Sequence, residues 1–277
     1  MRTIHVAHSP DSDDAFMFYA LAEGLVDTPF KYQHELSDIE SLNQRARRGE
    51  LEVSAVSIHA YAYLADRYAL LGSGCSMGDG YGPRLVSRTP PPGQRREALA
   101  GRPVAVPGLL TTACLALKLY QPECQPIVLP FDQIEDAVDR GEVEVGLLIH
   151  EGQLTHGDRG LTLWEDLGAW WQREHDLPLP LGGNVVRRDL GPEVVARVAR
   201  DVRASVEYAL AHRASALAHA GRYARGLTVD RTDTFVGMYV NQWTVDYGPV
   251  GRRAVQTLLD QAAARGLVPK ITVEFVG

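Results

Sequence analysis

Short apolar runs alternate with helix-like patterns along most of the chain. The runs are short enough to be β-strands, and turn-forming residues separate several of them from the next pattern. They lie at residues 3–7, 53–56, 69–72, 103–106 and 143–149, with a further strand inside residues 177–188. Strands that alternate with helices are typical of βαβ units. The pattern therefore predicts an α/β fold with a largely parallel sheet.

Helix start and stop signals account for much of the remaining sequence. Ser37-Asp38-Ile39-Glu40 and Asp132-Gln133-Ile134-Glu135 match the capping-box pattern, and Gly49 ends the first of these two helices. Three more helices follow strands, at about residues 15–23, 57–66 and 111–120. From Pro192 onward the chain is mostly helical, with Gly266 as a candidate C-cap. In this part, helices are expected at residues 201–213, 233–240 and 252–266.

Two stretches, near residues 88–102 and 183–190, are candidate crossovers between two lobes. The predicted larger lobe comprises residues 1–90 and 188–277, and the predicted smaller lobe comprises residues 91–187. The C-terminal helices are expected to return and pack on the larger lobe. Ligands of open α/β sheets bind beyond the carboxyl ends of the strands, and clefts between lobes are common ligand sites. We therefore expect a central ligand cleft between the lobes.

Composition and charge argue against several classes of function. The 277 residues carry 35 acidic and 28 basic side chains, a net charge of −7, whereas nucleic-acid binders normally show a basic surface. No apolar run reaches the roughly 18 residues of a membrane span, and the N-terminal segment lacks the apolar stretch of a signal peptide. Cys75, Cys114 and Cys124 are widely spaced and odd in number, which favours a reducing compartment. We expect a cytoplasmic monomer or homodimer that binds a small molecule.

Three loops follow predicted strands and lead into predicted helices. They contain the sequences SPDSDDAF, AVS and PGLLTTA, which place Asp13, Ser57 and Thr111 at helix starts. The N-terminus of a helix presents unpaired N–H groups and the positive end of the helix dipole, which favour an anion. Each residue taken alone also fits an ordinary N-cap. Their common position at strand carboxyl ends adds weight to a shared anion site.

His150 is the most informative titratable residue. It ends a strongly apolar strand and is followed by Glu151. A histidine at a strand end, near hydroxyl groups, fits a general base, and the local pattern alone also fits a structural histidine. No metal site is predicted, because HExxH would need histidine where Leu154 stands, and acidic residues at a helix start are more often caps. The absence of GxGxxG, Walker and nucleophile-elbow motifs argues against dinucleotide, nucleoside-triphosphate and acyl-enzyme chemistry.

Several longer motifs, taken together, resemble one known family. They are SPDSDDAFMFYAL, SLNQRARRGELEVSAVSIHAYAYL, VAVPGLLTTACLAL, GEVEVGLLIHE and LGAWWQREHDLPLPLGGNVVRRDLG. In this order they resemble the 1,4-dihydroxy-6-naphthoate synthase family of the futalosine route to menaquinone, from about residue 3 to about residue 260. The resemblance implies a type II periplasmic-binding-protein fold. It also implies a lyase that converts cyclic dehypoxanthinyl futalosine to 1,4-dihydroxy-6-naphthoate and dihydroxyacetone without a cofactor.

The resemblance also assigns roles to individual residues. His150 matches the proton acceptor of the family. Substrate contacts are implied for Val56 and Ser57 in the short loop before a helix, for the turn after the VPG sequence, and more weakly for two further positions. The turn contributes Thr111, Thr112 and Ala113, and the weaker positions are Asp14 and Asn43. A neutral imidazole would take the proton, while helix-end N–H groups and threonine hydroxyls would hold the substrate carboxylate.

One departure from the family pattern concerns the first loop. Many members carry SPCPNDTF where this chain has SPDSDDAF, and other members carry an SPDADD-type loop. Two alternatives to the main interpretation follow from the same observations. Chorismate dehydratase shares the implied fold and pathway, and a binding protein for a small anion would share the fold without catalysis. The first loop and His150 favour the naphthoate synthase reaction.

Overall fold

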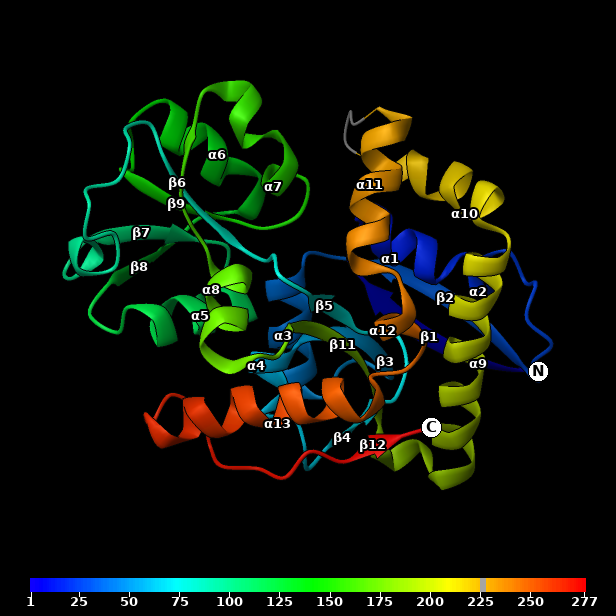
Figure 1. The fold of residues 1–277 in the computed structure, drawn as a ribbon. Coiled ribbons are helices and arrows are strands. Elements are labelled where there is room, and N and C mark those ends of the chain that lie inside the picture. Colours follow the sequence, from blue (N-terminus) through cyan, green and yellow to red (C-terminus); the bar gives the residue numbers. More distant parts are fainter. Residues whose placement is uncertain (225–227) are drawn as a thin grey trace.

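The computed structural model describes residues 1–224 and 228–277 and contains two β-sheets with helices packed against them (Figure 1). The larger sheet has the strand order β12-β4-β11-β3-β1-β2, with β5 paired to β11, and the smaller sheet has the order β10-β6-β9-β7-β8. The larger sheet consists of β1 (Arg2–His8), β2 (Phe30–Leu36), β3 (Val53–Ser57), β4 (Tyr68–Leu71), β5 (Ser76–Gly78), β11 (Leu179–Arg187) and β12 (Phe275–Val276). The smaller sheet consists of β6 (Arg84–Ser87), β7 (Pro103–Val106), β8 (Gln125–Val128), β9 (Val145–Leu148) and β10 (Thr162–Asp166).

All the strands expected from the sequence are present, with their ends shifted by no more than two residues. The prediction of a largely parallel sheet is wrong, however. β1 is parallel to β2 and β3, but β11 runs antiparallel to β3, β4 and β5, and β6 runs antiparallel to β9 and β10. The reason is topological, because β11 returns from the smaller sheet and enters the larger one between β3 and β4 in the opposite direction.

The helices follow the expected alternation. They are α1 (Ser12–Met17), α2 (Tyr19–Ala22), α3 (Ile39–Arg48), α4 (Ile58–Tyr61), α5 (Thr112–Tyr120), α6 (Phe131–Asp139), α7 (Gly152–Thr155), α8 (Leu167–His175), α9 (Pro192–Ala211), α10 (Arg213–Ala220), α11 (Val229–Tyr239), α12 (Gln242–Val245) and α13 (Gly248–Ala264). The helix expected at residues 15–23 is broken at Phe18 into α1 and α2. The helix expected at residues 57–66 shortens to α4 and continues as turns.

Several helix ends differ from the expected caps by one or two residues. Asp38, and not Ser37, caps α3 by accepting the Ser41 N–H, and Gly49 closes that helix at φ 76°. The second capping box does not form, because α6 already begins at Phe131. Gly266 has the expected left-handed backbone just beyond α13.

Sheet membership divides the molecule into two halves whose limits differ from the predicted lobes. The smaller half is built from β6–β10 with α5–α8, and the larger half from the other strands and helices. β6 lies within the range predicted for the larger lobe, and β11 lies within the range predicted for the smaller one. β6 ends just before the first predicted crossover and β11 overlaps the second, so the chain passes between the halves several residues earlier than predicted at both places, within residues 79–83 and 176–178.

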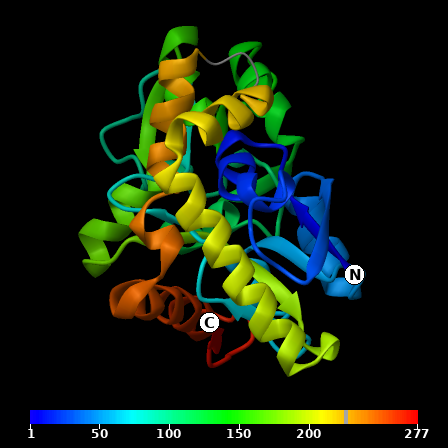
Figure 2. The ribbon, with the colours of Figure 1, turned by 90° about the vertical axis from the view of Figure 1, so that its right-hand side faces the viewer.

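The C-terminal helices return to the larger sheet, as expected. The long helix α9 crosses the outer side of that sheet (Figure 2) and packs on α2, β11 and β12. One buried apolar cluster extends from the larger half into the smaller half, through α4, α5 and β11. The two sheets therefore share a core on one side. Within residues 1–224 and 228–277, no helix has the length and apolar character needed to cross a membrane.

Candidate active site

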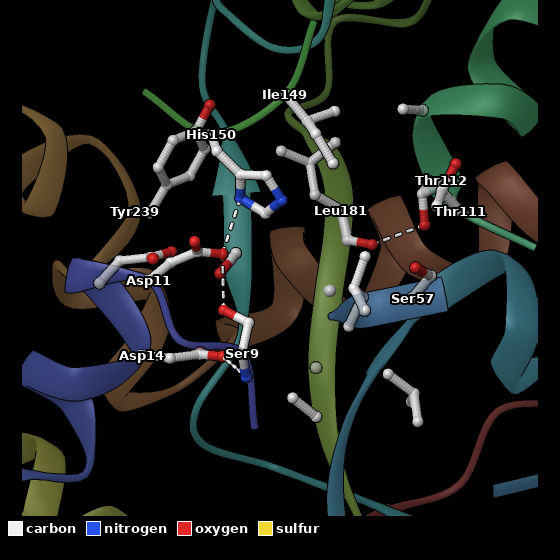
Figure 3. A pocket seen from close by; sticks show the side chains of 18 of the residues that line it. Ser9, Asp11, Asp14, Ser57, Thr111, Thr112, Ile149, His150, Leu181 and Tyr239 are labelled. Atoms are coloured by element: carbon white, nitrogen blue, oxygen red, sulfur yellow. Dashed lines mark hydrogen bonds and ion pairs between the residues drawn. The ribbon is translucent and has the colours of Figure 1, made fainter. Parts of the chain in front are cut away.

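A cavity lies between the two sheets, where the loops after several strands converge (Figure 3). The loop after β1, the end of β3, the first residues of α5, the residues after β9, and parts of β11 and α11 form its wall. The structure thus brings together segments that lie far apart in the sequence. Of the predicted site residues, the cavity is lined by Asp14, Val56, Ser57, Thr111, Thr112, Ala113 and His150.

Asn43 is the exception, because it lies behind the wall and not on it. Its side chain is fully buried. Its Oδ1 accepts the backbone N–H of Ser57 at 2.9 Å, and its Nδ2 donates to Ser57 Oγ at 3.0 Å and to the Leu110 carbonyl at 3.4 Å. Asn43 therefore supports the Ser57 loop from behind the cavity wall, and the substrate contact expected for it from the sequence stays a prediction.

The start of α5 presents backbone donors to the cavity, while its hydroxyls are engaged elsewhere. Thr111 Oγ1 accepts the Cys114 N–H at 3.2 Å and donates to the Gly108 carbonyl at 2.8 Å. Thr112 Oγ1 donates to the Leu181 carbonyl at 2.5 Å. A hydroxyl has one hydrogen to donate, so neither threonine hydroxyl offers one to a carboxylate. The donors that α5 directs at the cavity are the first-turn N–H groups of Thr112 and Ala113.

His150 reaches the cavity from the end of the fully buried strand β9. α6 packs closely on that strand at Gly146, where a Cβ atom would lie 2.7 Å from methyl carbons of Ile134 and Val138. The His150 backbone has φ 59°, which residues other than glycine adopt uncommonly. Its Nδ1 lies 2.8 Å from Asp11 Oδ2, and the other ring nitrogen points away from Asp11 into the cavity (Figure 3).

The protonation state of His150 differs from the neutral imidazole expected from the sequence. Burial lowers the pKa of His150, but the charge of Asp11, the hydrogen bond to it, and the charges of Glu151 and Asp13 outweigh that effect. The pKa of His150 is raised to about 9. At neutral pH the ring is therefore a cation, because it sits among carboxylates, of which only Glu151 is its neighbour in the sequence.

Two further carboxyl groups in the first loop hold protons more tightly than usual. Burial and the neighbouring Asp14 and Asp11 raise the pKa of Asp13 well above its ordinary value. Burial also raises the pKa of Asp14 to about 6, although the Ser9 N–H donates to Asp14 Oδ2 at 2.8 Å and favours the charged form. These shifts reduce the negative charge of the loop most at Asp13, whereas Asp14, with a pKa of about 6, is mostly ionised at neutral pH.

Three cavity residues, Asp11, Gln153 and Tyr239, were not predicted as site residues from the sequence. Asp11, which is the N-cap residue of α1 in place of the expected Asp13, contacts His150. The Tyr239 hydroxyl donates to Gln153 Oε1 across the cavity. The signal for Asp11 was its place beside Asp14 in the first loop, whereas nothing in the local sequence singled out Gln153 or Tyr239.

The described residues give no support for a metal centre, and the cysteines are free. Across residues 1–224 and 228–277, no group of three or more histidine, cysteine, aspartate or glutamate side chains is arranged to hold a metal ion. Cys75, Cys114 and Cys124 are all buried and free.

Comparison with known proteins gives a consistent result along nearly the whole chain. A family model described as menaquinone biosynthesis matches residues 4–264. A 1,4-dihydroxy-6-naphthoate synthase of Thermus thermophilus is 42% identical over 267 residues, which cover 96% of each chain. A second protein of that name, from Streptomyces coelicolor, is 37% identical and covers 97% of this chain and 96% of its own.

Solved structures extend the comparison to the fold. A crystal structure of an Archaeoglobus fulgidus protein has a TM-score of 0.91 and 45% sequence identity, and covers 96% of this chain and 98% of that one. The periplasmic aliphatic sulphonate-binding protein of Escherichia coli has a TM-score of 0.64 at 12% identity, covering 99% of this chain and 91% of that one. At this identity the likeness concerns the fold alone, and it confirms the predicted periplasmic-binding-protein-like architecture.

Proposed function

The chain belongs to the menaquinone biosynthesis family, and we propose that it is a lyase that converts cyclic dehypoxanthinyl futalosine to 1,4-dihydroxy-6-naphthoate and dihydroxyacetone. Two relatives that carry the name of this synthase match nearly the whole length. The observation that carries the proposal is the arrangement of the cavity. His150 of the smaller half faces Ser57 of the larger half across the space between the sheets, and the start of α5 lines the same cavity (Figure 3).

We place the substrate carboxylate at the start of α5. The N–H groups of Thr112 and Ala113 belong to the first turn of this nine-residue helix, where they add the helix dipole to their own hydrogen bonds. Ser57 Oγ accepts from Asn43, so its own hydrogen remains to donate into the cavity. Three neutral donors of this kind bind a carboxylate without placing a full positive charge beside it.

His150 takes the role of proton acceptor. Elimination requires the loss of a proton from a substrate carbon, and the ring nitrogen that faces the cavity receives it. The electron pair of the broken C–H bond forms a new double bond, while the dihydroxyacetone fragment departs with the electron pair of its own bond and a proton. A pKa near 9 makes the imidazole a strong base but leaves only about 1% of it unprotonated at pH 7. Turnover should therefore rise with pH.

Apolar wall residues keep water from the reacting atoms. Ile149, Leu181 and Phe235 line the same cavity as the polar groups. A dry site strengthens the electrostatic interactions within it and protects reactive intermediates. The three buried, free cysteines agree with the cytoplasm as the place of action, which we propose together with the reaction.

The test is a direct assay of the purified protein on two substrates. We expect the release of 1,4-dihydroxy-6-naphthoate from cyclic dehypoxanthinyl futalosine, followed by liquid chromatography and mass spectrometry, without added metal or nucleotide. Chorismate serves as the matched control and should remain unchanged. Dehydration of chorismate without turnover of the first substrate would contradict the proposal and identify a chorismate dehydratase. Tight binding of either compound without any product would identify a binding protein.

A further inference from the structure

Asp11 and His150 belong to opposite halves of the molecule. Asp11 lies between β1 and α1 of the larger half, whereas His150 follows β9 of the smaller half. Their side chains meet nevertheless, with Nδ1 of the ring 2.8 Å from Oδ2 of the carboxylate (Figure 3). The contact therefore exists only while the two halves stand at their present separation.

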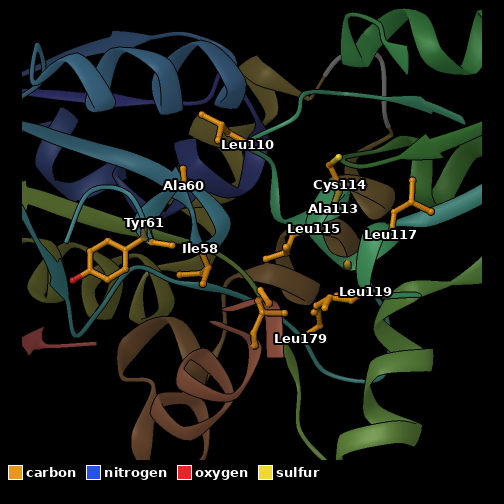
Figure 4. Close-up of a cluster of buried hydrophobic side chains, with 14 of the residues drawn as sticks. Ile58, Ala60, Tyr61, Leu110, Ala113, Cys114, Leu115, Leu117, Leu119 and Leu179 are labelled. Atoms are coloured by element: carbon orange, nitrogen blue, oxygen red, sulfur yellow. The ribbon is translucent and has the colours of Figure 1, made fainter. Parts of the chain in front are cut away.

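The two sides of the cavity are joined in different ways. On one side, a continuous apolar core links α4 and α5, where Ile58 and Leu115 belong to the same buried cluster (Figure 4). On the other side, the halves meet through polar contacts, such as the hydrogen bond from Tyr239 to Gln153. The contact between the imidazole and the carboxylate is on this polar side. Opening of the cavity around the apolar side would separate the two groups.

Both partners are held in place by their surroundings. Ser9 Oγ donates to Asp11 Oδ2 at 2.6 Å, and the Asp11 side chain is 2% exposed. The Phe131 ring packs on the imidazole in a T-shaped arrangement, with ring centroids 4.6 Å apart and an interplanar angle of 70°. A ring fixed in this way donates its Nδ1–H to Asp11. The nitrogen left for the substrate is Nε2, because the hydrogen bond at one ring nitrogen sets the tautomer.

Charged and titratable groups surround the ring from two elements. Asp11, Asp13 and Asp14 come from the loop and first turn of α1, and Glu151 is the next residue in the chain. Of these, Asp11 has the largest effect on the pKa of His150, through its charge and its hydrogen bond, and it opposes the lowering that burial causes. Without Asp11, burial would dominate, and the ring would lose its proton at a much lower pH.

We infer that Asp11 is a positioning residue that fixes the tautomer and basicity of His150 from across the cavity, so that closure of the two halves completes the proton acceptor. This inference rests on the proposed role of His150 as the base. In the reaction, the substrate C–H bond breaks and its proton moves to Nε2, while the Nδ1 proton stays in the hydrogen bond to Asp11. The carboxylate stabilises the imidazolium until it returns the proton to the departing fragment or to water.

The kinetic test compares Asp11→Asn with a matched control. The control, Asp158→Asn, removes a carboxylate that also forms an ion pair between the two halves, with Arg231. Unlike Asp11, Asp158 is half exposed and does not contact the imidazole ring. For the wild type, kcat/KM should rise with pH to a limit set by a pKa near 9. In Asp11→Asn the pKa that governs this rise should fall below about 7, and the maximal kcat should be about 10²- to 10⁴-fold lower. Asp158→Asn should keep the wild-type pKa in this pH dependence. An equal shift of that pKa in both variants overturns the inference.

A second measurement needs no turnover and therefore separates this inference from the proposed function. Nitrogen-15 NMR of the free protein should show His150 as the Nδ1–H tautomer above pH 9, and Asp11→Asn should lower its pKa by roughly two units or more. An unchanged pKa in the variant overturns the inference, whatever happens to turnover. A lowered pKa with an unchanged pH dependence of turnover overturns the base role of His150 instead. If the variant does not fold, the wild-type spectrum decides, because an Nε2–H tautomer overturns the inference.

Discussion

Replacement of Asn43 by alanine tests how the larger half supports the cavity wall. The Asn43 side chain is fully buried and joins three segments: α3, on which it stands, the Ser57 end of β3, and the Leu110 loop of the smaller half. Alanine retains the helix but cannot make any of these hydrogen bonds. The perturbation is therefore local to the junction between α3, Ser57 and Leu110.

The expected loss of stability follows from the groups left without a partner. The buried N–H of Ser57 loses its acceptor at 2.9 Å, and an unsatisfied buried donor costs about 1–3 kcal/mol. The Ser57 hydroxyl and the Leu110 carbonyl lose one donor at 3.0 Å and 3.4 Å, and the longer of these bonds contributes little. Together with the small void left by the amide, we expect Asn43→Ala to lower the free energy of unfolding by about 3 kcal/mol.

Urea denaturation followed by circular dichroism measures this loss. Gln44→Ala is the matched control, since Gln44 is the next residue on α3 and its amide donates to Glu40 one turn earlier, on the partly buried side of the helix. We expect the control to lose less than about 1 kcal/mol. A loss in Asn43→Ala that is no larger than that of Gln44→Ala would refute the reasoning, because the buried hydrogen bonds would then contribute nothing measurable.

Three further changes have expected outcomes. Ser57→Ala should raise KM about tenfold, the equivalent of about 1.4 kcal/mol, with kcat changed little. The control Ser54→Ala, on the same strand but outside the cavity, should leave steady-state kinetics unaltered. Asp14→Asn should stabilise the protein by up to roughly 3 kcal/mol at pH 8 and by nothing near pH 4, measured as the melting temperature across pH. The folded pKa of about 6 lies above the ordinary 3.8, so ionisation of Asp14 costs stability as pH rises through this window. Gly168→Ala should destabilise by about 3 kcal/mol or more in urea, because its Cβ would lie 1.9 Å from the Tyr81 carbonyl oxygen; a wild-type midpoint would contradict that close contact.

The parts of the fold that were predictable from the sequence have strong local signals. β9 lies in a strongly apolar run, and Thr111 caps α5 as expected, because an N-cap needs only its own helix. β2 was missed because FKYQHEL is mostly polar, and it forms the edge of the larger sheet beside β1. Its pairing with β1 stabilises it where its own side chains do not.

The chemistry of the site was less predictable than its location. Motifs at the ends of β1 and β3 located one wall of the cavity, because strand carboxyl ends that share a sheet edge lie close together, and the motif after β9 located the facing wall on the other sheet. The contact of Asp11 with His150 joins residues that are 139 positions apart and follow strands of different sheets, and no local pattern encodes it. This separation in the sequence also explains why a neutral imidazole was expected. The pKa of the ring depends on carboxylates such as Asp11, which only the fold brings close to it.

The most direct test of the account is the effect of His150→Asn on the conversion of cyclic dehypoxanthinyl futalosine. Asparagine tolerates the left-handed backbone at φ 59° better than most residues, and its amide can still donate to Asp11, so the fold should be preserved. We predict that kcat falls at least about 10²-fold while the dissociation constant of the substrate changes less than threefold, or about 0.7 kcal/mol. A variant that binds the substrate normally and retains a kcat within a few-fold of the wild type would contradict the account.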